Sequence, residues 1–158
     1  MFASDWKSSA TVRMNSGGPL TVVTGVDDAL NGINASTQYA SQVSADTYGN
    51  KSSDNLTGTN STSFWLNRAA FARPAPGTYG NMGPGTLHGP GSLNFDAGLS
   101  RLFQIKERQR VELRAEAQNV LNRTNFLDPS TSLSANTFGR IQSARDPRIM
   151  QFALKYSF

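Results

Sequence analysis

Two glutamates on one short segment have the spacing that general acid–base chemistry would need. Glu112 and Glu116 lie four residues apart, so they share one face of a helix and also one face of a strand. Arg110 and Arg114 alternate with them. On a strand all four side chains would point to one side, and the arginines would favour the ionised form of both carboxylates. The pattern therefore predicts a ladder of paired charges in preference to a proton-transfer pair.

Metal ligands are scarce in this sequence. It has no cysteine, and His88 is its one histidine, within a run rich in Gly and Pro. A transition-metal site would need carboxylates gathered around this imidazole by the fold, and an exposed turn residue is the simpler interpretation. Asp27 and Asp28, followed by Asn31 and Asn34, offer oxygen ligands for calcium but lack the spacing of an EF-hand. We expect no metal and no cofactor.

Motifs of other enzyme classes are incomplete. The two Gly-Pro-Gly segments, 83–85 and 89–91, lack the Lys-Ser/Thr that follows a phosphate-binding loop, and proline removes backbone donors. No serine lies in a Gly-x-Ser-x-Gly turn. We therefore expect that the protein is not an enzyme.

The composition suits β-structure with polar loops. Charged residues make up 16% of the sequence and hydrophobic residues 37%. The net charge is +4, but the densest basic group, between 106 and 114, is interleaved with glutamates, which is typical of a solvated face. Nucleic acid is therefore not an expected partner. No apolar run is long enough for a membrane helix, and the first residues lack the core of a signal peptide. A membrane role would need β-strands, with export directed by a segment outside this chain.

Strict alternation of apolar and polar residues predicts strands near the carboxyl end. From 150 to 158 every even position is apolar, and the odd positions are mostly polar. Two further segments alternate in the same way, 6–14 and 93–105, and Arg101 interrupts the apolar positions of the second. Each of these segments would present one apolar face and one polar face.

The segment 110–117 also alternates, but a helix is a serious alternative there. Its residues are good helix formers, and Leu113, Ala117 and Leu121 are spaced by four. Periodicity leaves both structures open.

The connections between these segments alternate in length. Lys106–Gln109 is a short polar turn, whereas 15–92 and 121–146 are long. Outer-membrane barrels join strands of about 10 residues by short periplasmic turns and longer extracellular loops. If 147–158 runs towards the periplasm, both long loops fall outside and Arg101 lies near the periplasmic interface, where its side chain can reach the headgroups. A soluble antiparallel sheet with unequal loops also fits this pattern.

Aromatic residues on the predicted strands suit the girdles of a membrane barrel, although aromatic residues favour strands in general. They are Trp6, Phe95, Phe103, Tyr156 and Phe158. The position at the end of the last strand supports only Tyr156 and Phe158 well.

The long tract 26–92 is predicted to be a polar extracellular loop. Between Thr47 and Ser63, 13 of 17 residues are Ser, Thr, Asn or Gly, which do not supply a packed core. Between Pro76 and Gly91, 9 of 16 residues are Gly or Pro, which predicts successive turns. The sequence thus divides into 1–25, a strand and the start of the loop; 26–92, the loop; and 93–158, three further strands.

The last eight residues, Gln151-Phe-Ala-Leu-Lys-Tyr-Ser-Phe158, resemble the β-signal by which outer-membrane barrels are recognised by the barrel-assembly machinery. That signal has a polar residue, a glycine and two aromatic residues at fixed positions. Gln151, Tyr156 and Phe158 match it, and Ala153 replaces the glycine. The resemblance implies an assembly signal made by these four residues.

More of the chain resembles the end of TonB-dependent receptors of the Oar-like group, which carry a carboxypeptidase-regulatory-like domain. The segments that carry this resemblance are Ser16-Gly-Gly-Pro-Leu-Thr-Val22, Gly77-Thr-Tyr-Gly-Asn-Met82, His88-Gly-Pro-Gly-Ser-Leu-Asn-Phe-Asp96, Arg114-Ala-Glu-Ala-Gln-Asn-Val-Leu-Asn122, Asn125-Phe126, Phe138-Gly139 and Asp146-Pro-Arg148. At Pro84-Gly85 the sequence departs from the more polar pair that the resemblance leads us to expect.

This resemblance implies an all-β fold: an antiparallel transmembrane β-barrel segment with long extracellular loops. It favours the strand at 110–120, and this chain would supply about the last four strands of a barrel of about 22 strands. Arg110, Glu112, Arg114 and Glu116 would then face the lumen.

The implied function is import of a bulky nutrient across the outer membrane of a Gram-negative bacterium. The expected partners are outer-membrane lipid, the barrel-assembly machinery, an unnamed ligand, and TonB through an N-terminal plug that lies outside this chain. The alternative is a secreted or cell-surface β-domain that binds a protein or a glycan. That alternative predicts that the apolar even positions of 150–158 are buried against another layer.

Overall fold

The computed structural model of the chain describes residues 5–33, 37–49 and 64–158. Most of the serine- and threonine-rich tract 47–63 lies outside these residues, so the prediction made for it is not addressed by the structure. Among the described residues, no helix is both long and apolar enough to cross a membrane. The chain forms two compact units. The sheet unit comprises 1–15, 92–125 and 145–158, and the loop unit comprises 16–91 and 126–144.

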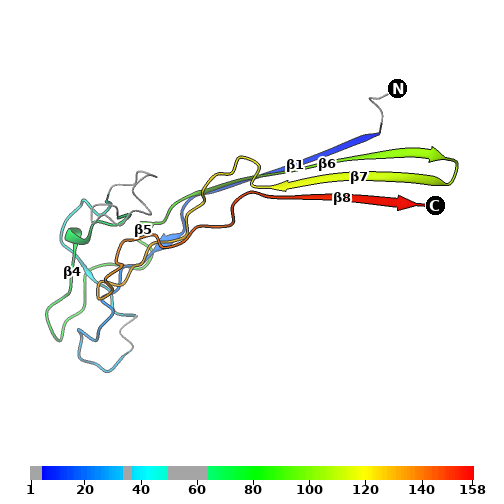
Figure 1. Cartoon of the computed structure of the whole chain (residues 1–158). Coiled ribbons are helices and arrows are strands. Elements are labelled where there is room, and N and C mark those ends of the chain that lie inside the picture. The colour runs from blue at the N-terminus through cyan, green and yellow to red at the C-terminus, as the bar shows by residue number, and fades with distance from the viewer. Residues whose placement is uncertain (1–4, 34–36, 50–63) are drawn as a thin grey trace. The chain divides into compact units, whose positions relative to one another are not determined.

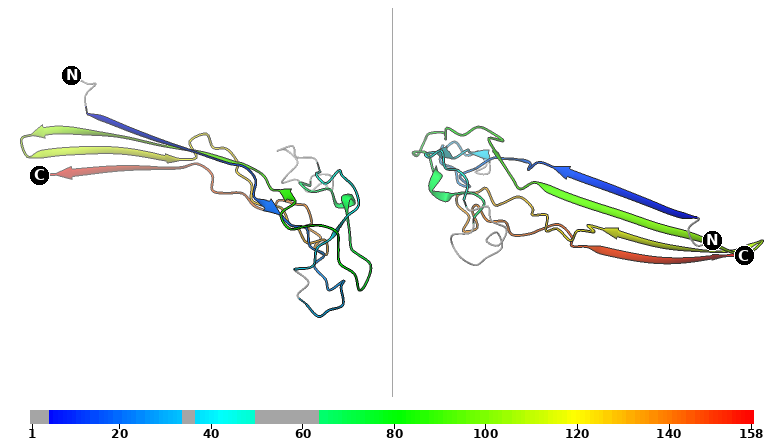
Figure 2. Two further views of the ribbon diagram at one scale, coloured as in Figure 1. Left: turned by 180° about the vertical axis from the view of Figure 1, so that it is seen from behind. Right: turned by 90° about the horizontal axis from the view of Figure 1, so that it is seen from above.

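The sheet unit is built on four long antiparallel strands in the order β1–β6–β7–β8. Their bounds are Trp6–Asn15 for β1, Ser92–Lys106 for β6, Gln109–Gln118 for β7 and Ile149–Ser157 for β8. Figures 1 and 2 show these strands side by side, with the β6–β7 turn at the same end of the sheet as the carboxyl end of β8. Each of the four segments that alternate in sequence is therefore a strand. The sheet is open, and β1 and β8 form its edges.

The segment that was ambiguous in sequence is strand β7. Its residues are good helix formers, but β7 lies between β6 and β8 and hydrogen-bonds to both. These two ladders satisfy the backbone of β7 and place its apolar residues beside those of its neighbours. Such tertiary pairing outweighs helix propensities, which differ by less than about 1 kcal/mol per residue.

The register places almost all apolar side chains of the sheet on one face. Residues opposite each other in an antiparallel pair point to the same side. One row across the sheet consists of Ala10, Ala97, Ala117 and Met150, and the neighbouring rows continue the pattern. We call this side the apolar face and the opposite side the polar face.

Strand β7 ends where its backbone changes conformation. Asn119 has a φ of 49°, in the left-handed region, where asparagine is tolerated better than most residues. Its backbone N–H leaves the ladder and donates to Asp96 Oδ1 on β6 at 3.0 Å. Its side chain holds the turn that follows, because Asn119 Oδ1 accepts from Arg123 N at 3.0 Å and its Nδ2 donates to Arg123 O at 2.9 Å. Asn119 therefore stops the strand and begins the long connection.

The loop unit has a hydrophobic core of its own. The sequence predicted a polar loop at 26–92, but apolar residues spaced far apart in this tract are buried together with residues from 16–25 and 126–144. The buried set is Leu20, Val22, Ala40, Leu66, Ala70, Phe71, Met82, Leu87, Leu133 and Phe138. Phe71 and Phe138, from the two separate connections, meet edge to face with ring centroids 5.7 Å apart. The described part of 26–92 is thus folded, despite its polar composition.

Short pairings complete the loop unit. Strand β2 (Pro19–Leu20) pairs with β5 (Leu87–His88), and β3 (Ser41–Gln42) pairs with β4 (Phe71–Ala72). The 3₁₀ helix η3 (Arg68–Ala70) is capped by Asn67, whose side chain accepts from Ala69 N at 3.1 Å.

Pro76-Gly77 forms a tight turn, as expected from the Gly/Pro content. Gly77 has a φ of +79°, and the N–H of Thr78 donates to Ala75 O at 3.0 Å. This turn therefore follows the local chemistry of proline and glycine.

Candidate functional site

The polar face carries the charge ladder that the sequence predicted on β7. Arg114 lies between two glutamates: its Nη2 donates to Glu112 Oε1 at 3.2 Å, and its Nη1 lies 3.6 Å from Glu116 Oε1. Arg110 lies on the same face, between Gln104 of β6 and Ser157 of β8. Both glutamates therefore have a cationic partner, and the arrangement is an ion-pair row along β7.

A second polar cluster on this face was not identified from the sequence. Asp96 accepts from three directions: from Arg13 Nη2 at 2.5 Å, from Asn94 Nδ2 at 2.7 Å, and from the backbone of Asn119. These contacts join β1, β6 and the end of β7. Asp96 and Asn119 both fall in segments that carry the family resemblance, but no local pattern brings them together.

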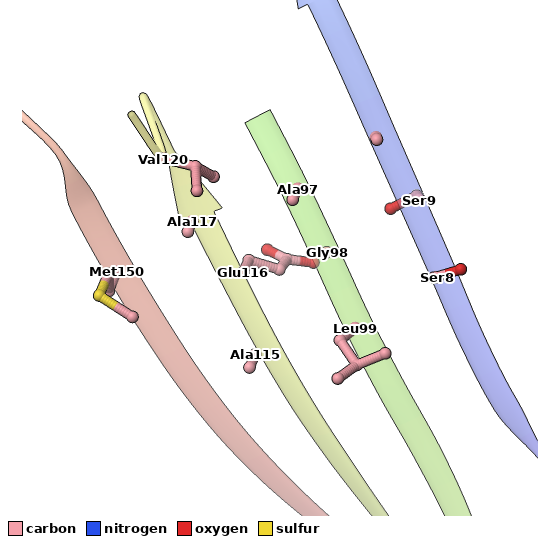
Figure 3. A pocket seen from close by; sticks show the side chains of 11 residues that line it. Ser8, Ser9, Ala97, Gly98, Leu99, Ala115, Glu116, Ala117, Val120 and Met150 are labelled. Atoms are coloured by element: carbon pink, nitrogen blue, oxygen red, sulfur yellow. The ribbon is translucent and has the colours of Figure 1, made fainter. Parts of the chain in front are cut away.

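The apolar face is exposed along both edge strands. Phe152 is 73% exposed and Leu154 is 69% exposed on β8, and Met14 is 75% exposed on β1. Near the middle of the face, small side chains leave an open hollow of about 470 Å³. Figure 3 shows Ala97 and Ala117 side by side there, with Met150 on the neighbouring strand. An exposed apolar surface of this extent is unfavourable in water, so it indicates contact with a membrane or another apolar surface.

Aromatic residues gather at one end of this face. Phe103, Val111 and Tyr156 form one row near the β6–β7 turn, and Trp6 lies in the next row, opposite Arg101. The rings of Tyr156 and Phe158 are 5.9 Å apart. Phe95, opposite Val12, lies towards the other end of β6. The aromatic residues that suit the membrane girdles thus lie towards both ends of the sheet. Most of them are near the short β6–β7 turn, and Phe95 is towards the other end of β6.

A comparison with protein families assigns the class of this sheet. The family model described as the outer membrane beta barrel domain matches residues 1–151. The chain belongs to the outer membrane beta barrel domain family. This membership supports an outer-membrane β-barrel protein. No curated protein and no solved structure matches the chain.

Membership of the outer membrane beta barrel domain family accounts for the two faces. Strands of such barrels alternate between apolar residues that face lipid and polar residues that face inward. The secreted β-domain considered as an alternative predicts that the even positions of β8 are buried. They are exposed in the structure, from Met150 to Tyr156. The apolar face is thus the side of this outer membrane beta barrel domain that suits lipid.

The four residues of the predicted assembly signal lie on both faces of β8 and beyond its end. Gln151 and Ala153 lie on the polar face, opposite Glu116 and Arg114, and Tyr156 lies on the apolar face. Phe158 follows the strand and is 94% exposed. Their recognition by the assembly machinery stays a prediction.

His88 lies in the loop unit, and its hydrogen bonds to the other described residues are made by its backbone. It was expected in a turn, but it forms part of strand β5, paired with Pro19. Its N–H donates to Tyr48 Oη at 2.9 Å, and its carbonyl accepts from Trp65 Nε1 at 3.0 Å. Within residues 5–33, 37–49 and 64–158, no group of three or more His, Asp and Glu side chains is placed to hold a metal ion.

Asp27 and Asp28, whose oxygen atoms were considered as calcium ligands and set aside, have separate structural roles. Asp27 accepts from Gln38 Nε2 at 2.6 Å and from the backbone of Gly32 at 2.9 Å. These bonds hold the pKa of the Asp27 carboxyl below its usual value, chiefly through Gln38. Asp28 is buried and accepts from Arg73 Nε at 2.9 Å. This ion pair raises the pKa of Arg73. Asn34 lies outside the described residues.

The turn around Asp27 is expected to loosen in acid. Because the folded pKa of Asp27 lies below its unfolded value of 3.8, its stabilising effect is complete above that pH and is lost as the pH falls through the folded pKa. Hydrogen exchange of the Gly32 amide, measured from about pH 5 to about pH 2.5 and corrected for intrinsic rates, should show this loss. In Asp27→Asn the protection should be weaker and should no longer change with pH. Equal profiles for both proteins would contradict this account.

Proposed function

We propose that this chain is the C-terminal barrel portion of a TonB-dependent receptor, which imports a bulky nutrient across the outer membrane of a Gram-negative bacterium. The observation that carries this proposal is the register of the sheet, which separates an exposed apolar face from a charged face over all four strands. The family assignment supports the barrel, and the resemblance of segments such as 88–96 and 114–122 supports the receptor class.

In this proposal the polar face lines the lumen. The ladder of Arg110, Glu112, Arg114 and Glu116 provides fixed charges of both signs, which suit a hydrated interior. Arg13 and Asp96 extend the charged surface to β1 and β6. Such a surface binds water and polar solutes, and its described residues form ion pairs in place of a catalytic arrangement. We therefore propose a transport protein and not an enzyme.

The loop unit supplies the extracellular surface that contacts the ligand. Its hydrophobic core holds the connections in a defined conformation, and a scaffolded loop is the usual place for a binding site. The ion pair between the buried Asp28 and the exposed Arg73 joins two parts of this unit that lie far apart in sequence. Energy for import comes from TonB through a plug outside this chain, and assembly depends on Gln151, Ala153, Tyr156 and Phe158.

The receptor class is tested by binding of TonB to the full-length protein. The protein is purified from outer membranes in detergent and mixed with the purified periplasmic domain of TonB, and complex formation is measured by calorimetry. We expect a one-to-one complex. A protein that runs as a heat-modifiable barrel but does not bind TonB would overturn the receptor proposal. That result would leave the outer membrane beta barrel assignment intact, because the two measurements are independent.

A further inference from the structure

Arg101 is the one charged residue in the central rows of the apolar face among the described residues. Trp6 lies opposite it on β1, and Leu113 lies opposite it on β7. On the lipid side of a barrel a charge is costly near the midplane and is tolerated close to the headgroups. The row that contains Arg101 is next to the row of Phe103 and Tyr156, on the side away from the β6–β7 turn. Arg101 is therefore close to the aromatic residues at that end of the sheet. Its place on the strand is therefore compatible with a position near the lipid headgroups, at the membrane–water interface.

Two aromatic rings hold the guanidinium in place. The Cζ atom of Arg101 lies 5.1 Å from the centroid of the Trp6 ring and 4.5 Å from that of Phe103. Cation–π contacts of this kind attract the guanidinium charge to the rings and do not pair its N–H groups with an oxygen acceptor. The rings thus restrict the side chain without satisfying its donors.

Within the part of the chain that the structure describes, Arg101 makes no hydrogen bond or ion pair, and its Nε is buried without an acceptor. Protein atoms cover Nε, so an external ligand would be bound by the two terminal amino groups of the guanidinium. A cation without an anionic partner on an apolar surface is unfavourable, and an anionic oxygen ligand at the surface of the apolar face would neutralise it.

We propose that Arg101, clamped by Trp6 and Phe103, binds the phosphate of a membrane phospholipid. A phosphate accepts two parallel hydrogen bonds from a guanidinium and neutralises its charge. The lipid's acyl chains then lie along the apolar face, towards the hollow at Ala97 and Ala117. This combination of a charged head site and an adjoining apolar surface matches a phospholipid, whereas a free phosphate would leave the apolar surface uncovered.

The position of Arg101 in the sheet also indicates which leaflet of the outer membrane holds the bound phospholipid. Arg101 lies towards the end of the sheet that carries the two-residue turn between β6 and β7, and short turns of outer-membrane barrels are periplasmic. The bound lipid therefore belongs to the periplasmic leaflet. This inference rests on the outer membrane beta barrel assignment and is independent of TonB.

The test is native mass spectrometry of the full-length protein purified from outer membranes in mild detergent. We expect the wild-type protein to retain phospholipid, and to bind added short-chain phosphatidylglycerol about tenfold or more tightly than Arg101→Gln does. Arg101→Lys keeps the charge but loses the two-pronged donor, so it should show an intermediate affinity. Lys7→Gln is the matched control, since Lys7 is next to Trp6 on the polar face and should bind phosphatidylglycerol as the wild type does.

Each variant is first checked for heat-modifiable migration, so that loss of lipid is measured only on folded barrels. If Arg101→Gln fails this check, the comparison of Arg101→Lys with the wild type decides the matter. Equal affinity for phosphatidylglycerol in the wild type and the folded Arg101 variants would overturn the proposal. Competition by inorganic phosphate alone at the same concentration, or retention of lipopolysaccharide in place of phospholipid, would overturn it as well, by showing a free-anion site or the opposite leaflet.

Discussion

Deletion of Tyr156, Ser157 and Phe158 from the full-length protein is expected to abolish its assembly in the outer membrane. Two effects combine. The deletion removes the last two rungs between β8 and β7, at Val111 and Arg110, and so leaves backbone groups of β7 without partners in lipid. It also removes both aromatic residues of the segment that resembles the β-signal.

The measurement is membrane fractionation with a heat-modifiability assay of the intact and truncated proteins. Phe158→Tyr keeps an aromatic residue at the last position, so this control variant should assemble normally. We expect the truncated protein to be absent from the heat-modifiable fraction. If the intact and truncated proteins are both soluble and fold alike, the strand β8 does not cross a membrane and the barrel interpretation of these residues is wrong.

An arginine at Phe152 is expected to destabilise the barrel strongly, whereas an arginine at the adjacent Gln151 is expected to be tolerated. Phe152 lies on the apolar face, four residues from Tyr156, which corresponds to about 10 Å of depth for a tilted strand. An arginine at the bilayer midplane costs about 2–4 kcal/mol, and loss of the phenyl group from lipid adds to this. Gln151 lies on the polar face opposite Glu116, so an arginine there meets a carboxylate.

The two substitutions form a matched pair, because they introduce the same side chain into neighbouring positions on one strand. Gln151→Arg also keeps a polar residue at the first position of the predicted assembly signal. The midpoint of urea unfolding, measured in vesicles for the full-length variants, should fall for Phe152→Arg and should stay close to wild type for Gln151→Arg. The reverse order would show that the apolar face is not the lipid face.

The alternation of residue types was sufficient to predict the strands β1, β6 and β8. Side chains on a strand point to alternate sides, so the apolar even positions of 150–158 are bound to lie on one face once the strand forms. The placement of Arg110, Glu112, Arg114 and Glu116 on one face follows from the same rule. The contrast between the short turn at 107–108 and the two long connections is likewise a property of the sequence alone.

Tertiary structure decided what local pattern left open. Residues 109–118 suit a helix or a strand by propensity, and only the hydrogen bonds from β6 and β8 select the strand. Asp96 and Asn119 are 23 residues apart, and they meet because the register of β6 and β7 brings them together. The core of the loop unit joins apolar residues, such as Leu66 and Phe138, that are scattered among polar ones in the sequence. Their spacing has no periodicity from which this core could be predicted. Contacts between residues that are distant in sequence depend on the tertiary fold of the whole chain, and the spacing of neighbouring residues does not predict them.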